Sequence, residues 1–190
     1  MQVDNLFLDK LLGKGAFADV YLTRIKDDTG LYATKVYNRE QTEASSSLFN
    51  YLKAEINLLK GINHPNIVKL KDVTKTKKHF YLVLEYCNGG ELKNALDKYK
   101  LKYNKAFSEE IVQYLMRQIV DAMNYLHSRN IMHRDIKLEN ILLNYDSEED
   151  KNNLNIMKAT VKIVDFGFAI YLKHSLTESV VGNPLNMDPL

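Results

Sequence analysis

Hydrophobic and polar positions alternate along the first part of the chain and then recur at helical spacing. The alternation predicts five strands, at residues 5–12, 20–23, 31–37, 67–73 and 80–84. Apolar residues at every third or fourth position over 48–60 predict a helix that Gly61 ends. The polar, serine-rich residues 38–47 before it predict a mobile loop. Residues 1–86 are therefore expected to form a small antiparallel sheet with one main helix.

From residue 87 onward the pattern is mainly helical. Residues 91–105 are helical and rich in lysine, and Ser108 is the expected N-cap of a helix that continues to about Ser128. The apolar stripe of that helix is wide, which indicates a buried core helix; its members are Ile111, Val112, Leu115, Met116, Ile119, Val120, Ala122, Met123 and Leu126. Residues 144–158 predict a polar surface loop, and 161–164 predict a strand. The fold class is α+β, with a second, mainly helical part over 87–190.

Composition excludes several classes of protein. The chain has 190 residues, of which 45% are hydrophobic, enough for a proper core. The formal net charge of +2 does not favour nucleic acid as a partner. The single cysteine, Cys87, rules out a disulfide within the chain and fits a reducing compartment. No apolar run reaches membrane-spanning length, and the first residues, Met1 to Asp4, lack the basic and apolar regions expected of a leader. We expect a cytoplasmic protein without an integral membrane segment.

A glycine-rich turn separates the first two predicted strands. Gly13 and Gly15 let the backbone approach a phosphate closely and leave amides free to donate to it, while Ala18 stands where a third glycine would be. A dinucleotide-binding fold would place a helix after such glycines, and here a strand follows. On this motif alone, an ordinary hairpin and a phosphate loop remain equally good interpretations.

A lysine and a glutamate form the next candidate pair. Strand periodicity puts Ala33 and Lys35 on one face, where a small residue leaves room for a base and a cation can meet phosphates. Glu55 lies at the edge of the apolar stripe of the predicted helix, so it needs a partner, and Lys35 is the candidate. The alternative is that both side chains simply face water.

The stretch His133 to Asn140 carries the densest chemistry in the chain. Asp135 can accept a proton from a hydroxyl, Lys137 can neutralise a phosphate oxygen, and Asn140 can hold a metal through its carbonyl. Asp165, at the end of the strand over 161–164, is followed by Phe and Gly and suits a second metal ligand. Taken alone, the stretch also reads as a solvated turn.

The order of these motifs resembles that of the protein kinases, over residues 6–190. A glycine loop between strands comes first, followed by Ala-x-Lys, a helix glutamate, His-Arg-Asp-x-Lys-x-x-Asn and Asp-Phe-Gly. The resemblance implies a bilobal kinase fold with an ATP-binding N-lobe over 1–86 and a partial C-lobe over 87–190. The implied function is transfer of the γ-phosphoryl group of ATP to a protein hydroxyl, with ATP and Mg²⁺ as cofactors.

The resemblance also implies a role for each matching residue. The catalytic residues would be Asp135 and Lys137, supported by Lys35, which holds phosphates, and its partner Glu55. The metal ligands would be Asn140 and Asp165. The nucleotide would be bound by Gly13, Gly15, Ala18, Val20, Ala33, Lys35, the backbones of Glu85 and Cys87, Glu91 at the ribose, and Leu142. Leu84 would be the gatekeeper, and Leu59, Leu70, His133 and Phe166 would form a stacked spine.

Finer features suggest a subgroup and a form of regulation. Lys137, two residues after the catalytic Asp135, is typical of Ser/Thr kinases. Residues 84–92, the insert after Leu143 and residues 165–172 resemble the autophagy-initiating Unc-51-like kinases. Arg134 implies control by phosphorylation, with Thr177 and Ser179 as the expected sites and Ser175 behind them. The implied partners are a protein substrate with a Ser or Thr acceptor and regulatory proteins.

The last residues depart from the kinase pattern. Asn183 stands where the family has Thr or Ser, and residues 188–190 read Asp-Pro-Leu in place of Ala-Pro-Glu. The sequence stops before the remaining helices of a C-lobe, so we expect an uncovered apolar face on the helix over 109–128. Three hypotheses remain open: an active kinase core, an ATP-binding pseudokinase-like scaffold, and an inactive fragment.

Overall fold

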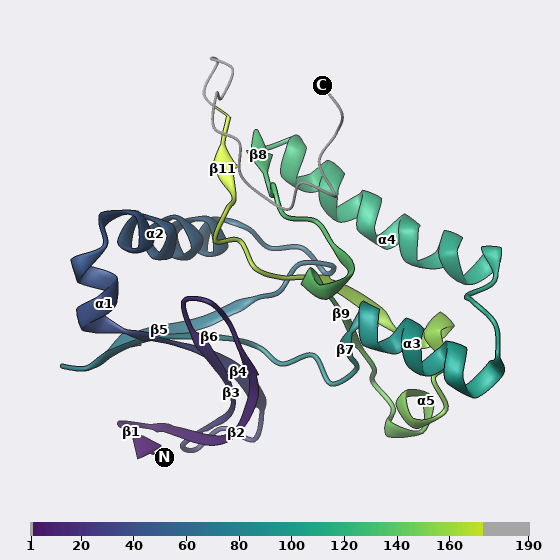
Figure 1. The fold of residues 1–190 in the computed structure, drawn as a ribbon, viewed down its shortest axis with the longest axis horizontal. Coiled ribbons are helices and arrows are strands. Elements are labelled where there is room, and N and C mark those ends of the chain that lie inside the picture. The colour runs from purple at the N-terminus through teal and green to yellow at the C-terminus, as the bar shows by residue number, and fades with distance from the viewer. Residues whose placement is uncertain (1, 173–190) are drawn as a thin grey trace. The chain divides into compact units, whose positions relative to one another are not determined.

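The computed structural model describes residues 2–172, which form two compact units (Figure 1). The first unit contains residues 2–62 and 69–86, and the second contains residues 63–68 and 87–172. Each unit has its own hydrophobic core. The predicted α+β class, with a small antiparallel sheet and one main helix followed by a mainly helical part, is confirmed.

The first unit is built on a six-stranded antiparallel sheet in the order β1-β2-β3-β4-β6-β5. Its strands are β1 (Gln2–Val3), β2 (Leu6–Lys14), β3 (Asp19–Ile25), β4 (Leu31–Asn38), β5 (Leu70–Lys75) and β6 (His79–Glu85). Two helices, α1 (Arg39–Ala44) and α2 (Ser46–Gly61), lie between β4 and β5 in the chain. Strand alternation buries one face in a cluster of Leu6, Leu8, Val36, Tyr81 and Val83. The central strand β4 pairs on both sides, which makes it a rigid base for the side chains it carries.

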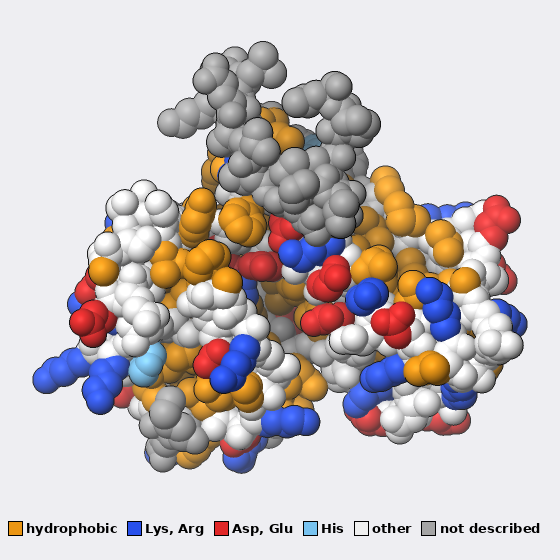
Figure 2. All heavy atoms as spheres, viewed as in Figure 1, with side chains coloured by type: hydrophobic (Ala, Val, Ile, Leu, Met, Phe, Trp, Pro, Cys, Tyr) orange, Lys and Arg blue, Asp and Glu red, His pale blue; other side chains and the backbone are white. Residues whose placement is uncertain are grey.

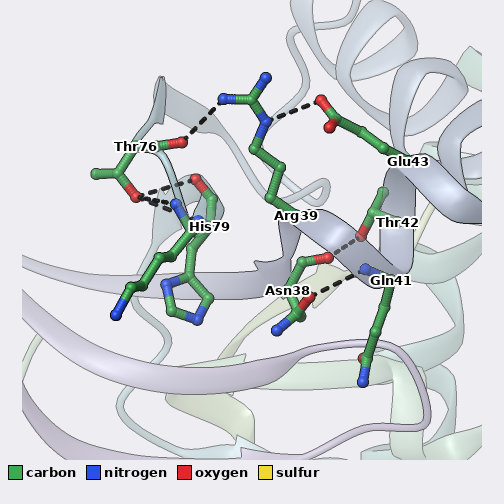
Figure 3. A network of polar contacts seen from close by, with 8 residues as sticks. Asn38, Arg39, Gln41, Thr42, Glu43, Thr76 and His79 are labelled. Carbon is green, nitrogen blue, oxygen red and sulfur yellow. Dashed lines mark hydrogen bonds and ion pairs between the residues drawn. The ribbon is translucent and has the colours of Figure 1, made fainter.

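The loop predicted over 38–47 is wrong, because most of it is helical. Asn38 caps α1 by accepting a hydrogen bond from the Gln41 amide at 3.0 Å, and the Thr42 hydroxyl donates to the Asn38 carbonyl. Arg39 then joins α1 to the β5–β6 turn, donating to Glu43 at 2.8 Å and to the Thr76 carbonyl at 3.3 Å (Figure 3). Polar residues that cap a helix look the same in sequence as polar residues in a loop.

Other boundaries of the first unit also differ from the prediction. The side chain of Ser45 caps α2, which therefore begins at Ser46. Gly61 is the last helical residue and Ile62 follows it as the C-cap in an extended conformation. The strand predicted from residue 67 begins only at Leu70, because Ile67 belongs to the second unit and forms a parallel bridge with Ile163 there.

The second unit combines helices with two short sheets. Its elements are β7 (Gly90–Glu91), α3 (Leu92–Tyr103), α4 (Glu109–His127), β8 (Ile131–Met132), the 3₁₀ turn η1 (Leu138–Asn140), β9 (Ile141–Asn144), α5 (Glu148–Asn152), η2 (Ile156–Lys158), β10 (Thr160–Ile163) and β11 (Ile170–Tyr171). The sheets run β10-β9-β7 and β11-β8, all antiparallel. Ser108 caps α4 as predicted, accepting from the Ile111 amide.

The segment 144–158 is more than the polar surface loop that its composition predicts. It contains α5 and η2, and it contributes Tyr145 and Ile156 to the core of the second unit. Asn88 fixes the start of the segment, since its side chain donates to the Tyr145 carbonyl and accepts from the Tyr145 amide, both at 2.9 Å. Two buried side chains among many polar ones are too weak a pattern to predict this packing.

The apolar stripe of α4 divides into a buried part and an exposed part. Ile111, Leu115, Ile119, Ala122 and Leu126 are buried, as the prediction of a core helix requires. Val112, Met116 and Val120 are instead 45%, 47% and 57% exposed, and Figure 2 shows hydrophobic side chains on the surface along this helix. The expected uncovered apolar face is therefore present on α4.

Candidate active site

The glycine loop closes a hairpin between β2 and β3 in the first unit. The Gly15 amide donates to the Ala18 carbonyl at 2.9 Å, so the loop folds back on itself. A Cβ at Gly15 would lie 3.0 Å from that carbonyl oxygen, closer than ordinary contact, which favours glycine there. Gly13 and Gly15 are both exposed. The loop thus presents backbone to the surface, as a phosphate-binding turn requires.

One face of the sheet gathers several of the predicted nucleotide-binding residues. Val20 on β3 lies directly opposite Lys35 on β4, and Ala33 lies two residues before Lys35 on the same face. Leu84 on β6 lies opposite Ala33 from the other side. At the end of β6, the Glu85 amide donates to the Lys69 carbonyl and its carboxylate accepts from the Lys69 amide. These contacts fix the backbone where the first unit ends.

Lys35 and Glu55 form an ion pair, which confirms the partner predicted for Glu55. The Lys35 ammonium lies 2.7 Å from Oε1 of Glu55, and Glu55 is only 1% exposed. The second carboxylate oxygen, Oε2, accepts a hydrogen bond from the Tyr37 hydroxyl at 2.9 Å. Tyr37 was missed in the sequence, although strand alternation places it on the Lys35 face. An aromatic residue in a buried strand suggests a packing role, so the sequence gives no sign that its hydroxyl makes a hydrogen bond.

The loop from His133 to Asn140 lies in the second unit and is organised around Asp135. Oδ2 of Asp135 accepts from the Lys137 ammonium at 2.8 Å and from the Asn140 side-chain amide at 2.8 Å. The same Asn140 nitrogen also donates to the Asp135 carbonyl at 2.9 Å. Asp135 is buried. The structure therefore brings together the three residues that the sequence predicts as base, cation and metal ligand.

The electrostatics of this loop keep Lys137 charged. The hydrogen bond to Asp135 raises the pKa of Lys137 above its ordinary value; partial burial opposes this, and the charges of Asp135, Asp165 and Glu139 add to it. Lys137 therefore carries a full positive charge over the whole neutral range. A charged ammonium beside the Asp135 carboxylate suits the neutralisation of a phosphate oxygen.

His133 and the Asp-Phe-Gly segment hold the loop in place. The ring of His133 bonds the Val164 carbonyl through Nε2 at 3.0 Å and receives the Asp135 amide at Nδ1, so the proton is assigned to Nε2. The buried ring of Phe166 packs against His133 with centroids 4.8 Å apart. Arg134 and Asp165 have φ of 66° and 65°, in the left-handed region. Such strain in two polar residues is typical of functional sites.

Glu91 and Leu142 come together in the small sheet of the second unit. They lie opposite each other in the β7–β9 ladder, and Glu91 is also the N-cap residue of α3. Oε2 of Glu91 accepts from the Asn94 side chain at 3.1 Å. Cys87 is buried at the start of this unit. The expected phosphorylation sites Ser175, Thr177 and Ser179, and the departures at 183 and 188–190, lie outside the described residues.

Two oxygen atoms of the second unit fit the requirements of a magnesium ligand set. The side-chain nitrogen of Asn140 donates both of its hydrogen bonds to Asp135. No described residue donates to Oδ1 of Asn140, so this side-chain oxygen is left for a cation. Asp165 supplies a carboxylate. The backbone amide of the preceding residue, Val164, donates to the backbone carbonyl of Asn140 at 3.0 Å. Amide and carboxylate oxygens are the hard ligands that Mg²⁺ prefers.

No helix in the described part of the chain is both long and apolar enough to cross a membrane.

Comparison with known proteins identifies one family. The model of the protein kinase domain matches residues 7–189. Serine/threonine-protein kinase 33 of Mus musculus is 33% identical over 95% of this chain, and Serine/threonine-protein kinase ULK1 of Homo sapiens is 39% identical over 94% of it. Myosin light chain kinase A of Dictyostelium discoideum is 37% identical over 94%. The matched regions span 35%, 16% and 55% of those three proteins, so the chain corresponds to part of each.

Proposed function

Because the chain belongs to the protein kinase family, we propose that it is a serine/threonine kinase that transfers the γ-phosphoryl group of Mg-ATP to a protein hydroxyl. The observation that supports this most directly is the arrangement of Asp135, Lys137 and Asn140. Lys137 and Asn140 both bind Oδ2 of Asp135, while no described residue donates to its Oδ1. One oxygen is thus fixed by the protein and the other is left for a substrate.

In the proposed reaction, Oδ1 of Asp135 accepts the proton of the Ser or Thr hydroxyl as that oxygen bonds to the γ-phosphorus. The bond between this phosphorus and the bridging oxygen breaks, and its electron pair leaves with ADP. Lys137 neutralises negative charge on the phosphoryl group during transfer, which its raised pKa favours. The two donors on Oδ2 keep the carboxylate from rotating away from the hydroxyl.

The nucleotide would be bound by residues that the family pattern assigns. Lys35, oriented by Glu55, would bind the α- and β-phosphates, and the amides of Gly13, Gly15 and Ala18 would cover them. The adenine would meet the backbone of Glu85 and Cys87 and the apolar side chains of Val20, Ala33 and Leu142, with Glu91 at the ribose. Asn140 and Asp165 would hold magnesium, which when bound neutralises the phosphates.

A narrower proposal concerns the biological setting. The resemblance of residues 84–92 and 165–172 to the Unc-51-like kinases, together with 39% identity to human ULK1, supports a kinase of that group. We propose a cytoplasmic role in autophagy initiation, with protein substrates and regulatory protein partners. Loss of the encoded protein should then reduce autophagic flux in the source cell, and unchanged flux would reject this assignment.

The direct test of the activity is phosphotransfer to a generic basic protein. The wild-type chain should transfer phosphate only with Mg-ATP, and Asp135→Asn should lower kcat by roughly 10²–10⁴, because the amide cannot accept the proton. Asp97→Asn is a matched control, since Asp97 is exposed on α3 and its nearest cation, Lys93, is 3.9 Å away. Stabilisation by Mg-ATP without any transfer would instead favour a nucleotide-binding scaffold.

A further inference from the structure

The carboxylate of Glu55 is held at both of its oxygens, and only one of the two donors is the lysine. Lys35 donates to Oε1 at 2.7 Å and the Tyr37 hydroxyl donates to Oε2 at 2.9 Å. Glu55 and Tyr37 are 1% and 6% exposed, so water has little access to the hydroxyl or the carboxylate. Buried carboxylates need such partners, because an unpaired oxygen loses its hydration without compensation.

The two donors come from one rigid strand. Lys35 and Tyr37 are two residues apart on β4, so both side chains leave the same face of the sheet. Both are paired with β6, Lys35 opposite Leu82 and Tyr37 opposite Phe80, and Lys35 is also paired with Val20 on β3. The carboxylate on α2 therefore meets the strand at two points. Two points of contact fix the rotation of α2 about its axis more firmly than a single ion pair does.

The second donor differs from the first in how it behaves during the reaction. A lysine that binds phosphates must share its ammonium between them and Glu55, so its hold on Glu55 weakens when nucleotide enters. The Tyr37 hydroxyl bonds to the other oxygen, and the kinase pattern assigns it no contact with phosphate. It can therefore keep Glu55 and α2 in place while Lys35 serves the nucleotide.

We propose that Tyr37 is a positioning residue for phosphoryl transfer: its hydroxyl holds Glu55, and with it α2, in the position where Glu55 orients Lys35. This inference rests on the proposed function, since orientation of Lys35 matters for the reaction only if the chain binds ATP. Loss of the hydroxyl should reduce the fraction of molecules with a correctly oriented Lys35 and lower turnover accordingly.

The test compares two tyrosine-to-phenylalanine variants of the whole chain. Tyr37→Phe removes the hydroxyl that bonds Glu55 and keeps the ring. Tyr32→Phe is the matched control, because Tyr32 lies on the same strand and its hydroxyl also donates to a carboxylate, that of Asp28 at 2.8 Å. We expect Tyr37→Phe to lower kcat at saturating Mg-ATP by about tenfold, equivalent to about 1.4 kcal/mol, with the KM for the protein substrate unchanged.

Two further measurements separate positioning from general stability. In a Glu55→Ala background, adding Tyr37→Phe should not lower kcat further, because the hydroxyl acts through Glu55. Hydrogen exchange of the α2 amides should be faster in Tyr37→Phe than in the wild type and unchanged in Tyr32→Phe. A Tyr37→Phe variant that loses thermal stability but keeps wild-type kcat would overturn the proposal.

The exchange measurement also distinguishes failure of this inference from failure of the proposed function. If the wild-type chain transfers no phosphate, the proposed function is wrong, and exchange alone then decides whether Tyr37 positions α2. Equal α2 exchange in the Tyr37→Phe and Tyr32→Phe variants would overturn the positioning role in that case. Faster exchange confined to the Tyr37→Phe variant would support it.

Discussion

Replacing Lys35 by methionine should destabilise the chain through the glutamate it leaves behind. Methionine keeps most of the length and apolar surface of the lysine side chain but removes the charge. In the wild type the ammonium lies 2.7 Å from Glu55, and the two side chains are 14% and 2% exposed. Breaking a buried pair on one side costs about 3–5 kcal/mol. Because Tyr37 still donates to Glu55, we expect the low end, about 3 kcal/mol.

A second substitution, at Glu55, should restore part of the stability that Lys35→Met loses. Lys35→Met combined with Glu55→Leu removes both charges, so no buried carboxylate remains unpaired. The remaining cost is the Tyr37 hydroxyl, which loses its acceptor, at about 1 kcal/mol. The double variant should therefore be more stable than Lys35→Met alone by about 2 kcal/mol. An added substitution that restores stability is a signature of an uncompensated charge.

Urea unfolding followed by far-UV circular dichroism measures both variants, and it suits a chain without tryptophan. Lys71→Met is the control, because Lys71 is exposed and pairs with Asp28 at the surface at 3.2 Å; its loss should be much smaller. The reasoning is refuted if Lys35→Met unfolds at the same urea concentration as Lys71→Met. It is also refuted if the double variant is less stable than the single one.

Two further predictions concern buried hydroxyls that make no hydrogen bond to any described residue, those of Thr34 and Tyr145. Thr34→Val should raise the free energy of unfolding by about 1 kcal/mol, since it replaces an unsatisfied hydroxyl by a methyl group; a lower melting temperature would contradict this. Burial raises the pKa of the Tyr145 phenol to about 12. The folded state favours the neutral Tyr145 phenol, and this preference contributes fully to the free energy of unfolding below the unfolded pKa of about 10. The contribution is lost as pH rises towards 12. Absorbance titration should show that Tyr145→Phe removes an ionisation near pH 12, and removal of a step near pH 10 would show the burial argument to be wrong.

The sequence predicts the parts of the site that depend on local spacing. Asp135, Lys137 and Asn140 lie within six residues of one another, so a single loop can bring their side chains together. The pairing of Lys35 with Glu55 is also predictable, because a carboxylate at the edge of an apolar stripe requires a cation and the strand supplies one. In both cases the chemistry of the side chains is enough to predict which residues contact each other.

Other features depend on contacts that no local pattern contains. The acceptor of the Tyr37 hydroxyl lies 18 residues away on α2, and the partner of the His133 ring, the Val164 carbonyl, lies 31 residues away. A buried tyrosine and a loop histidine have many suitable partners in a chain of this size, so sequence alone does not select these. The helix α1 was missed for a different reason, since Asn38 serves equally well in a cap and in a turn.

The segment Asn63–Val68 belongs to the second unit although both of its neighbours in the chain belong to the first. The chain therefore passes between the units three times, after residues 62, 68 and 86. Cleavage after residue 86 would leave one fragment carrying Ile67 and Val68, buried in the intact chain, without the Ile163 backbone they pair with. The Asn66 side chain would likewise lose its acceptor at Val161. Expressed separately, the two fragments should fold poorly, and they should recover structure when they are mixed.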